Sequence, residues 1–337
     1  MPDKKALNTL KPVITYIASG GTIAMERGEV ASGPVPSIGG EDLLSQVSGL
    51  NLNISVEVKN FSNIPSAHLT PGDWISLYRH ITAALARDEV SGVIVSHGTD
   101  TMEETGFFLD LTLNSSKPVI LFGAQRSACE PDTDGPDNLL DALLVAASGE
   151  ARHKGVMIVM NHQICGARDV SKTHTTDIDS FQCGERGVLG AVNGGQVQFN
   201  CEPYGRRHLP LISGQLSRVD IIPVYAGVDD LMIRAAMEAG AGGIVIQALG
   251  AGNVNASLLK AITEAIWAGI TIVIASRVPR GSVKPIYGYP GGGQTLAQAG
   301  AIFANNLSPQ KARVLLMLAL QVKSHQHNIG HFFQPVL

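Results

Sequence analysis

Short apolar runs rich in Val and Ile recur along the chain, each followed by glycine or a small polar residue. The segments between them have helix length, and their apolar residues repeat about every 3.6 positions. Continuous apolar strands that alternate with helices are typical of a parallel sheet covered on both faces. The sequence therefore predicts an α/β protein built on parallel sheets. The runs occupy residues 13–18, 93–96, 119–122, 156–160, 221–224, 244–248 and 270–275.

The clearest predicted helix covers residues 71–85. Thr70 is a good N-cap residue, and Pro71 suits the first helical position. Two more helices are predicted over residues 102–113 and 310–322, the second opened by a Ser-Pro pair. One face of the first helix carries its apolar residues Trp74, Leu77, Ile81 and Leu85.

The length of 337 residues predicts two domains, because single cores rarely grow beyond about 250–300 residues. Residues 200–217 are polar and contain two prolines and an Arg-Arg pair, which is typical of a boundary. We therefore expect an N-terminal α/β domain over residues 1–205, a linker over 206–218 and a C-terminal α/β domain over 219–337. Both domains are expected to be flavodoxin-like.

Composition excludes several classes of protein. The formal net charge is −4 and no Lys/Arg run is present, so no nucleic-acid or membrane partner is expected. The apolar run at 314–320 is too short to span a bilayer, and no signal peptide is recognisable at the start. The cysteines form no CxxC pair, which favours free thiols in a reducing, cytoplasmic compartment. They are Cys129, Cys165, Cys183 and Cys201.

Polar residues follow four of the predicted strands, at 19–22, 97–101, 123–126 and 249–253. In open α/β sheets, ligands bind beyond the carboxyl ends of the strands. The Gly-Gly-Thr at 20–22 is a weak nucleotide signal, because GxGxxG is absent and the glycines could simply form a tight turn. The His-Gly-Thr-Asp-Thr at 97–101 is denser. Asp100 or Thr101 could merely cap the next helix, but a cap does not require both hydroxyls, the acid and the His-Gly.

A third polar run spans residues 168–177. Its Lys172 could serve as a general base beside a threonine nucleophile, or could be a solvated lysine on a loop. His68, His97 and His174 match no standard metal spacing, so supporting or core roles are favoured for them.

These motifs resemble the bacterial-type L-asparaginase family. Two carry the resemblance: Ala-Ser-Gly-Gly-Thr-Ile-Ala at 18–24, and His-Gly-Thr-Asp-Thr-Met-Glu-Glu-Thr at 97–105. Further matches follow in family order up to about residue 322. They lie at 123–126, 134–136, 168–176, 250–253 and 309–313.

The resemblance implies a role for each matched residue. Thr22 matches the family's nucleophile, and Thr99, Asp100 and Lys172 match a second threonine with its acid and base. Asp100 would also hold the α-ammonium group of the substrate, and the Thr99 main-chain N–H would help to form an oxyanion hole.

The remaining matches concern substrate binding. Ser66 matches the residue that binds the α-carboxylate, and the Ala124 carbonyl would receive the leaving amide. Asn253 matches a residue that reaches the substrate from the neighbouring subunit. The expected substrate site also contains Gly21, Ala67 and Gly98.

The chain departs from the family pattern in four places. No Tyr occurs in the loop 25–37, and Ala67 replaces the Gln of the Ser-Gln pair found in periplasmic members. The C-terminal Glu has no counterpart; Tyr287 and Tyr289 stand in its place and could either supply a hydroxyl or only pack an interface. The family's periplasmic cysteine pair is unmatched, since serines occupy positions 115 and 116.

We therefore expect a cytoplasmic amidohydrolase that converts L-asparagine to aspartate and ammonia with a threonine nucleophile. No metal or organic cofactor is expected. The resemblance implies a homo-oligomer, either a dimer or a dimer of dimers. The alternatives are hydrolysis of glutamine, D-asparagine or N-substituted asparagine, and a catalytically silent relative that binds amino acids.

Overall fold

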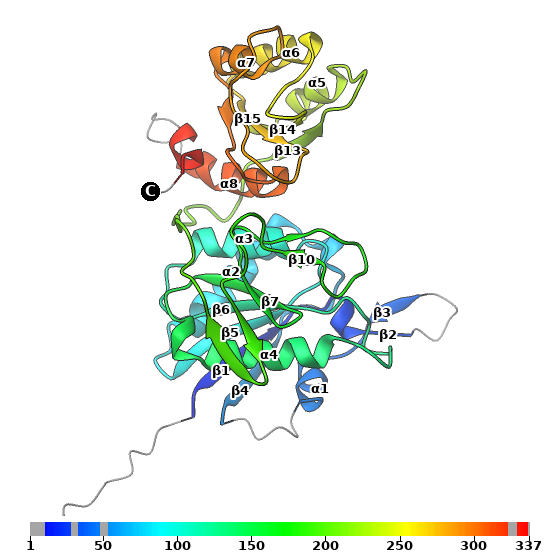
Figure 1. Ribbon diagram of the computed structural model, residues 1–337, viewed down its shortest axis with the longest axis vertical. Coiled ribbons are helices and arrows are strands. Elements are labelled where there is room, and N and C mark those ends of the chain that lie inside the picture. The colour runs from blue at the N-terminus through cyan, green and yellow to red at the C-terminus, as the bar shows by residue number, and fades with distance from the viewer. Residues whose placement is uncertain (1–10, 28–32, 48–52, 323–328, 336–337) are drawn as a thin grey trace, which may run out of the picture.

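A computed structural model describes residues 11–27, 33–47, 53–322 and 329–335 of the chain. Within these residues the chain forms two α/β domains, one above the other along the long axis of the molecule (Figure 1). The larger domain contains an eight-stranded sheet and the smaller one a four-stranded sheet. The predicted fold class, with a larger N-terminal and a smaller C-terminal domain, is confirmed.

Five parallel strands form the centre of the larger sheet, in the spatial order β4-β1-β5-β6-β7. The chain thus starts in the middle, adds one strand on one side and then continues on the other, as in flavodoxin. The order reverses beside β1, and ligands bind outside the carboxyl ends of the strands at such a point. The strands are β1 (Val13–Ala18), β4 (Ser55–Asn60), β5 (Val90–Ser96), β6 (Val119–Phe122) and β7 (Val156–Met160), extended by antiparallel β8 (Gln163–Gly166), β11 (Gly190–Asn193) and β12 (Gln196–Phe199).

Helices cover both faces of this sheet. α2 (Pro71–Leu85) and α3 (Met102–Thr112) pack with Ile17 on one face, whereas α1 (Gly40–Ser45) and α4 (Gly135–Ala147) pack with Ile14 and Tyr16 on the other. Because side chains alternate along a strand, β1 must be apolar on both sides to be buried in this way. Apart from the buried Thr15, its sequence is apolar, as that requirement predicts.

Helix α2 begins and ends as its sequence predicts. Thr70 and Asp73 form a capping box, and Pro71 occupies the first turn. Thr101 stands at the N-cap of α3 without a side-chain cap hydrogen bond, because its hydroxyl donates to the carbonyl oxygen of Ser66 instead, at 3.0 Å.

The smaller sheet has four parallel strands in sequential order, β13 (Val219–Pro223), β14 (Gly243–Ala248), β15 (Thr271–Ser276) and β16 (Ile302–Phe303). α5 (Leu231–Glu238), α6 (Ala256–Trp267) and α7 (Gly293–Ala299) cover one face. α8 (Pro309–Gln321) covers the other. No described residue between 200 and 218 belongs to a helix or strand.

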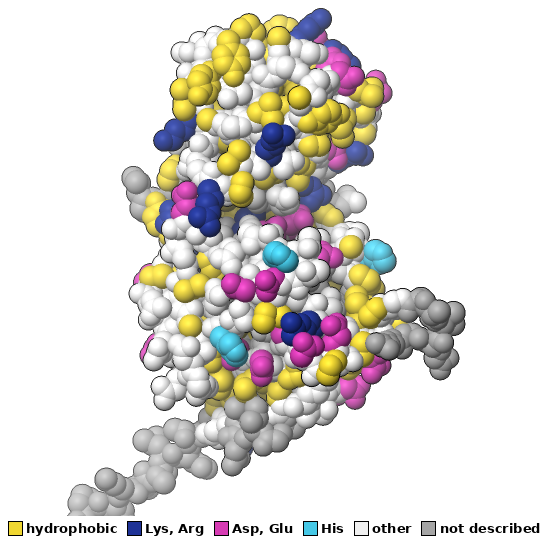
Figure 2. Space-filling model, turned by 45° about the vertical axis from the view of Figure 1, so that its right-hand side comes forward, with side chains coloured by type: hydrophobic (Ala, Val, Ile, Leu, Met, Phe, Trp, Pro, Cys, Tyr) yellow, Lys and Arg dark blue, Asp and Glu magenta, His cyan; other side chains and the backbone are white. Residues whose placement is uncertain are grey.

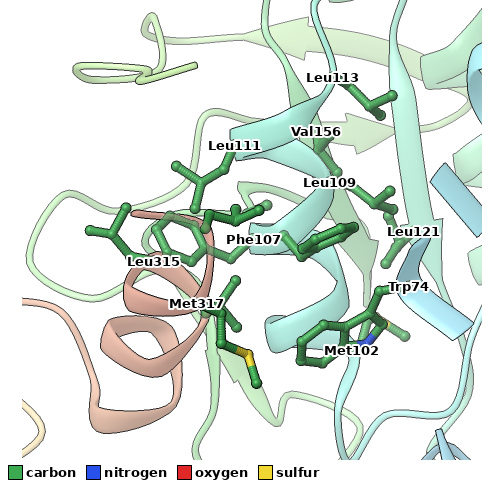
Figure 3. Packing of buried hydrophobic residues seen from close by; sticks show 14 of the residues in the cluster. Trp74, Met102, Phe107, Leu109, Leu111, Leu113, Leu121, Val156, Leu315 and Met317 are labelled. Atoms are coloured by element: carbon green, nitrogen blue, oxygen red, sulfur yellow. The ribbon is translucent and has the colours of Figure 1, made fainter. Parts of the chain in front are cut away.

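Helix α8 joins the two domains. Phe107 and Leu111 of α3 lie against Leu315 and Met317 of α8, and these residues belong to one apolar cluster that extends into both sheets (Figure 3). Within the described residues, no helix is both long and apolar enough to cross a bilayer. Short elements complete the chain: β2 (Met25–Arg27), β3 (Pro34–Pro36), β9 (Ser171–Lys172), β10 (Phe181–Gln182) and the 3₁₀ turns Thr22–Ala24, Ser66–His68, Gly149–Ala151 and Ile329–Phe333.

The prediction of four free thiols is wrong for two of them. Cys165 on β8 and Cys183, directly after β10, form a disulfide with their Cα atoms 5.9 Å apart. Cys129 and Cys201 are free and exposed. No sequence signal marks this pair, because a spacing of 18 residues belongs to no recognised motif and only the tertiary fold brings the two side chains together.

Candidate active site

The loops that follow β1 and β5 are in close contact. Gly20 and Gly21 adopt φ values of 93° and 88°, which favour glycine. A Cβ atom on Gly21 would lie 2.5 Å from the Cα atom of Gly98, so no larger residue fits between the two loops. This contact brings Thr22, at the start of the first 3₁₀ turn, beside the Gly98-Thr99 segment.

Ser66 joins the same group from the turn after β4. It is buried, and a Cβ atom on Gly98 would lie 2.7 Å from its Oγ atom. The Thr101 hydroxyl fixes the Ser66 main chain through the hydrogen bond described above. Ala67 follows Ser66 directly and is exposed. The structure therefore brings together the predicted residues at the ends of β1, β4 and β5.

The loop after β6 completes this edge of the sheet. A Cβ atom on Gly123 would lie 2.4 Å from the carbonyl oxygen of His97, so the buried Ala124 comes next to the 97–99 segment. Asp134 holds the loop by accepting hydrogen bonds from the main-chain N–H groups of Gln125 and Arg126. Asp134 was not predicted to have a separate role, although its Asp-Gly-Pro motif opens α4 and matches the family.

Lys172 reaches this group from the antiparallel β9–β10 pair. Its Nζ atom lies 2.8 Å from Thr99 Oγ1 and 2.8 Å from Asp100 Oδ1. The Lys172 side chain is 16 % exposed and that of Asp100 is 67 % exposed, so the lysine is inside the site and the carboxylate faces the opening. Thr99 and Lys172 are thus linked through a direct hydrogen bond across 73 positions of sequence.

His97 lies behind this arrangement and is completely buried. Its Nδ1 atom is 2.7 Å from the carbonyl oxygen of Gly98, which belongs to the same peptide unit as the Thr99 N–H. Burial lowers the pKa of His97 to about 4, only partly offset by that hydrogen bond. The imidazole is therefore neutral at neutral pH and donates through Nδ1, so it orients the Gly98-Thr99 peptide rather than carrying charge.

Asn253, Tyr287 and Tyr289 form a separate group in the C-terminal domain. Asn253 Oδ1 accepts a hydrogen bond from the Gly293 N–H, and the two exposed tyrosine rings lie 5.8 Å apart. α7, which follows these tyrosines, lies at the far end of the molecule from β2, which follows Thr22 (Figure 1). A single chain therefore does not bring this group to Thr22.

The C-terminal domain of the same chain approaches the site from another side. Lys172 lines a cavity of about 510 Å³ between the domains, whose opposite wall includes Ser276, Arg277 and Asn306. Basic and acidic side chains lie side by side along this junction (Figure 2). Within the described residues, no group of three or more His, Cys, Asp or Glu could hold a metal ion.

Comparisons with known proteins agree with this arrangement. Residues 13–204 match the family Asparaginase, N-terminal, and residues 218–333 match the Glutaminase/Asparaginase C-terminal domain. L-asparaginase 2 of Escherichia coli is 34 % identical, over 96 % of this chain and 92 % of that protein. A probable L-asparaginase of Deinococcus radiodurans is 37 % identical, over 96 % of this chain and 97 % of that protein.

A solved structure gives the same result for the fold. The crystal structure of a probable cytoplasmic L-asparaginase from Campylobacter jejuni superposes with a TM-score of 0.87 at 33 % identity, over 96 % of this chain and all of that one. Both domains, the order of the motifs and the meeting of their loops at one sheet edge lead to one conclusion: this chain belongs to the L-asparaginase family of amidohydrolases.

Proposed function

We propose that this protein hydrolyses the side-chain amide of L-asparagine to L-aspartate and ammonia, with Thr22 as the nucleophile. The observation that carries the proposal is the position of Lys172 Nζ, 2.8 Å from both Thr99 Oγ1 and Asp100 Oδ1, beside the loop that bears Thr22. A hydroxyl, a base and an orienting carboxylate in contact are the pattern that activates a nucleophile.

The substrate is held at its α-carbon and presented through its side chain. Asp100, the most exposed member of the group, binds the α-ammonium, and Ser66 binds the α-carboxylate. The Thr99 N–H stabilises the negative charge that develops on the amide oxygen, and His97 fixes the orientation of that N–H through the Gly98 carbonyl. Ala124 offers its carbonyl oxygen to the leaving amide group.

The chemistry proceeds in two displacements. The Thr22 oxygen forms a bond to the amide carbon while the Thr99–Lys172 pair takes the hydroxyl proton. That proton passes to the nitrogen, the C–N bond breaks and ammonia leaves, so that aspartate remains esterified to Thr22. Water then attacks the ester carbon with the same pair as base. The C–O bond to Thr22 breaks, aspartate is released, and the Thr22 oxygen takes back a proton.

The decisive test is ammonia release by Thr22→Ala, with Thr22→Ser as the matched control that keeps a hydroxyl. We expect Thr22→Ala to lower kcat by roughly three to six orders of magnitude at unchanged thermal stability, as loss of a nucleophile does elsewhere. The serine variant should retain measurable turnover. Substantial activity in Thr22→Ala would rule out Thr22 as the nucleophile.

The substrate is tested with a panel of amides: L-asparagine, D-asparagine, glutamine and N-substituted asparagines. L-Asparagine should give the highest kcat/KM. Ala67 and His68 are exposed beside Ser66, which favours some activity on substituted asparagines. Binding of these amino acids without ammonia release from any of them would identify a silent binding protein instead.

We also propose that the site is completed by a second copy of the chain. Asn253 and Tyr287 are polar, grouped and partly or fully exposed, yet they lie far from Thr22 of their own chain. In a two-fold dimer, both copies use the same surface at the interface. Each copy can therefore contribute this group to the site of its partner. The neighbour then supplies Asn253, with Tyr287 or Tyr289 in place of the missing Glu.

Subunit exchange tests this arrangement. Inactive Thr22→Ala and inactive Asn253→Ala proteins are mixed under conditions that exchange subunits. Up to about half of the sites in a mixed dimer then contain an intact Thr22 and an intact Asn253, and activity returns. If activity does not return although mass measurement shows that mixed dimers have formed, each chain builds its own site. Sizing by light scattering distinguishes a dimer from a dimer of dimers.

Finally, we infer a cytoplasmic location. The support is the Campylobacter jejuni structure, which is of a probable cytoplasmic enzyme, and the serines at positions 115 and 116 where periplasmic members carry a cysteine. The Cys165–Cys183 disulfide argues for an oxidising compartment. Cell fractionation with thiol trapping decides between the two: enzyme recovered with the periplasmic contents would refute the cytoplasmic assignment.

A further inference from the structure

Lys311 is a buried lysine whose location α8 itself does not explain. Its side chain is only 2 % exposed, and lysine is rarely buried to that degree unless it is paired. It lies in the first turn of α8, where the helix dipole disfavours a positive charge. Ser308 caps this turn by accepting the Lys311 main-chain N–H, so the cap does not need the lysine side chain. The reason for the buried ammonium must therefore lie outside α8.

The partners of the ammonium group are in the N-terminal domain. Lys311 Nζ donates hydrogen bonds to the main-chain carbonyl oxygens of Arg168, at 2.8 Å, and of Val170. Burial lowers the pKa of Lys311 to about 8, and the carboxylates of Glu103 and Asp169 oppose that shift. Glu103 Oε2 is itself buried without a hydrogen-bond partner. The site thus combines main-chain acceptors with nearby negative charge, which suits an ammonium group.

The two carbonyls belong to the segment that leads directly to Lys172. On one side of this segment, the N–H groups of Asp169 and Val170 donate to the Gly166 oxygen, at 3.1 and 3.2 Å. On the other side, the Lys311 ammonium group donates hydrogen bonds to the carbonyl oxygens of residues 168 and 170. The chain then enters the two-residue strand β9, where Lys172 is the residue opposite Phe181.

A strand of two residues gives little resistance to displacement on its own. The hydrogen bonds of Lys172 to Thr99 and Asp100 require its backbone to stay in place, because both distances are already 2.8 Å. A displacement of about 1 Å at a catalytic group can cost on the order of 100-fold in rate. The hydrogen bond from Lys311 to the Val170 carbonyl, two residues before Lys172, therefore affects the site even though Lys311 does not touch the catalytic groups.

We propose that Lys311 is a positioning residue for Lys172: from the C-terminal domain, it holds the 168–170 main chain so that Lys172 meets Thr99 and Asp100. The inference rests on the catalytic role of Lys172 proposed above. It makes the activity of the N-terminal domain depend on the docking of α8, and it gives the buried lysine a function that apolar packing between the domains does not supply.

The test is Lys311→Met, which keeps most of the length of the side chain and removes its donors. The matched control is Arg313→Met on the same helix. Arg313 also crosses between elements, donating to the Val219 oxygen at 2.9 Å and approaching Glu104 at 3.6 Å, but it does not contact the 168–170 segment. We expect kcat of Lys311→Met to fall by roughly 10- to 100-fold and that of Arg313→Met to stay near wild type.

A purely structural role would change stability without separating kcat from KM. For a positioning role, KM and the affinity for the product aspartate should change by no more than about threefold, since the binding groups stay intact. Hydrogen exchange at the Thr173 N–H, which donates to the Ser180 oxygen at 2.7 Å, should speed up in Lys311→Met only. Lys311→Gln, which retains a shorter neutral donor, should fall between wild type and Lys311→Met.

The outcomes separate this inference from the proposed function. If Lys172→Met is inactive and Lys311→Met turns over like wild type, the positioning role is refuted and the proposed function stands. If Lys172→Met itself remains active, the proposed base is wrong. If neither Lys311→Met nor Lys311→Gln folds, as judged by circular dichroism and gel filtration, Lys311 serves the fold and the positioning role is likewise refuted.

Discussion

The Cys165–Cys183 disulfide should contribute measurably to the stability of the N-terminal domain. It joins β8 to the end of the β9–β10 pair across a sequence separation of 18 residues, and both side chains are buried. In the chain-entropy account, closing a loop of that length removes about 3 kcal/mol of conformational entropy from the unfolded state. That free energy corresponds to roughly a 100-fold change in the unfolding equilibrium.

The perturbation is a set of three variants: Cys165→Ala, Cys183→Ala and the double change. Each one opens the same loop, so each single variant should lose nearly as much stability as the double variant. The changes should therefore be strongly non-additive. The control is Cys129→Ser with Cys201→Ser, which removes the two exposed free thiols and should leave stability unchanged.

The assay is equilibrium unfolding in guanidinium chloride, followed by tryptophan fluorescence. Trp74 is buried in the N-terminal domain, whereas Trp267 is 81 % exposed in the C-terminal domain. A Trp267→Phe background therefore makes the signal specific for the domain that contains the disulfide. Thiol titration of the unfolded, unreduced protein should find two thiols per chain, because the sequence has four cysteines and two are paired.

Three results would contradict this prediction. Four reactive thiols in the unreduced protein would mean that the bond does not form. Additive losses from the two single variants would mean that each cysteine acts through local packing rather than through the constraint. A midpoint unaffected by all three variants would show that this region is already held by other contacts, such as the Lys311 hydrogen bonds to residues 168 and 170 just before β9.

Three further predictions concern single residues. The pKa of His97 is about 4 in the folded protein and near 6.5 when unfolded. Above pH 6.5 the neutral His97 should not lower the free energy of unfolding, and as the pH drops to 4 that free energy should fall by up to about 3 kcal/mol. His97→Gln should lack this dependence in acid-unfolding curves. Gly21→Ala should abolish turnover, since its Cβ would lie 2.5 Å from Gly98, whereas Gly33→Ala, with no atom within 4 Å, should be neutral in the same assay. Arg206→Met removes the cation 3.0 Å from the buried Asp110 and should lower the free energy of unfolding by about 3–5 kcal/mol, as measured by thermal unfolding. This loss should become smaller in acid, because burial raises the pKa of Asp110 and its protonation removes the unpaired charge. A deficit independent of pH would show that Arg206 acts by packing alone.

Local sequence patterns determined most of the buried parallel strands and the helix α2, but not the edge strands β4 and β16 or the antiparallel β8, β11 and β12. The run Val13–Ala18 is apolar except for Thr15 because both faces of β1 are buried, and the start of α2 follows from Thr70, Pro71 and Asp73. The parallel arrangement also placed the residues after β1 and β5 at one edge, which is why Thr22 and Thr99 could be predicted to lie together. Each of these signals is contained within about one element, or follows from the direction of neighbouring strands.

Contacts between distant segments were decided only by the tertiary structure. The use of the Thr101 hydroxyl on Ser66 and the pairing of Cys165 with Cys183 have no local signature. Lys172 was recognised through a family motif, but its contact with Thr99 depends on a two-residue strand without periodicity. Nothing in the sequence around Lys311 marks it as buried, yet α8 is buried between the domains and its ammonium donates to carbonyl oxygens 143 and 141 positions earlier in the chain. Periodicity reports which face of an element is apolar; it carries no information about which distant backbone that face will meet, because the path of the whole chain fixes that contact.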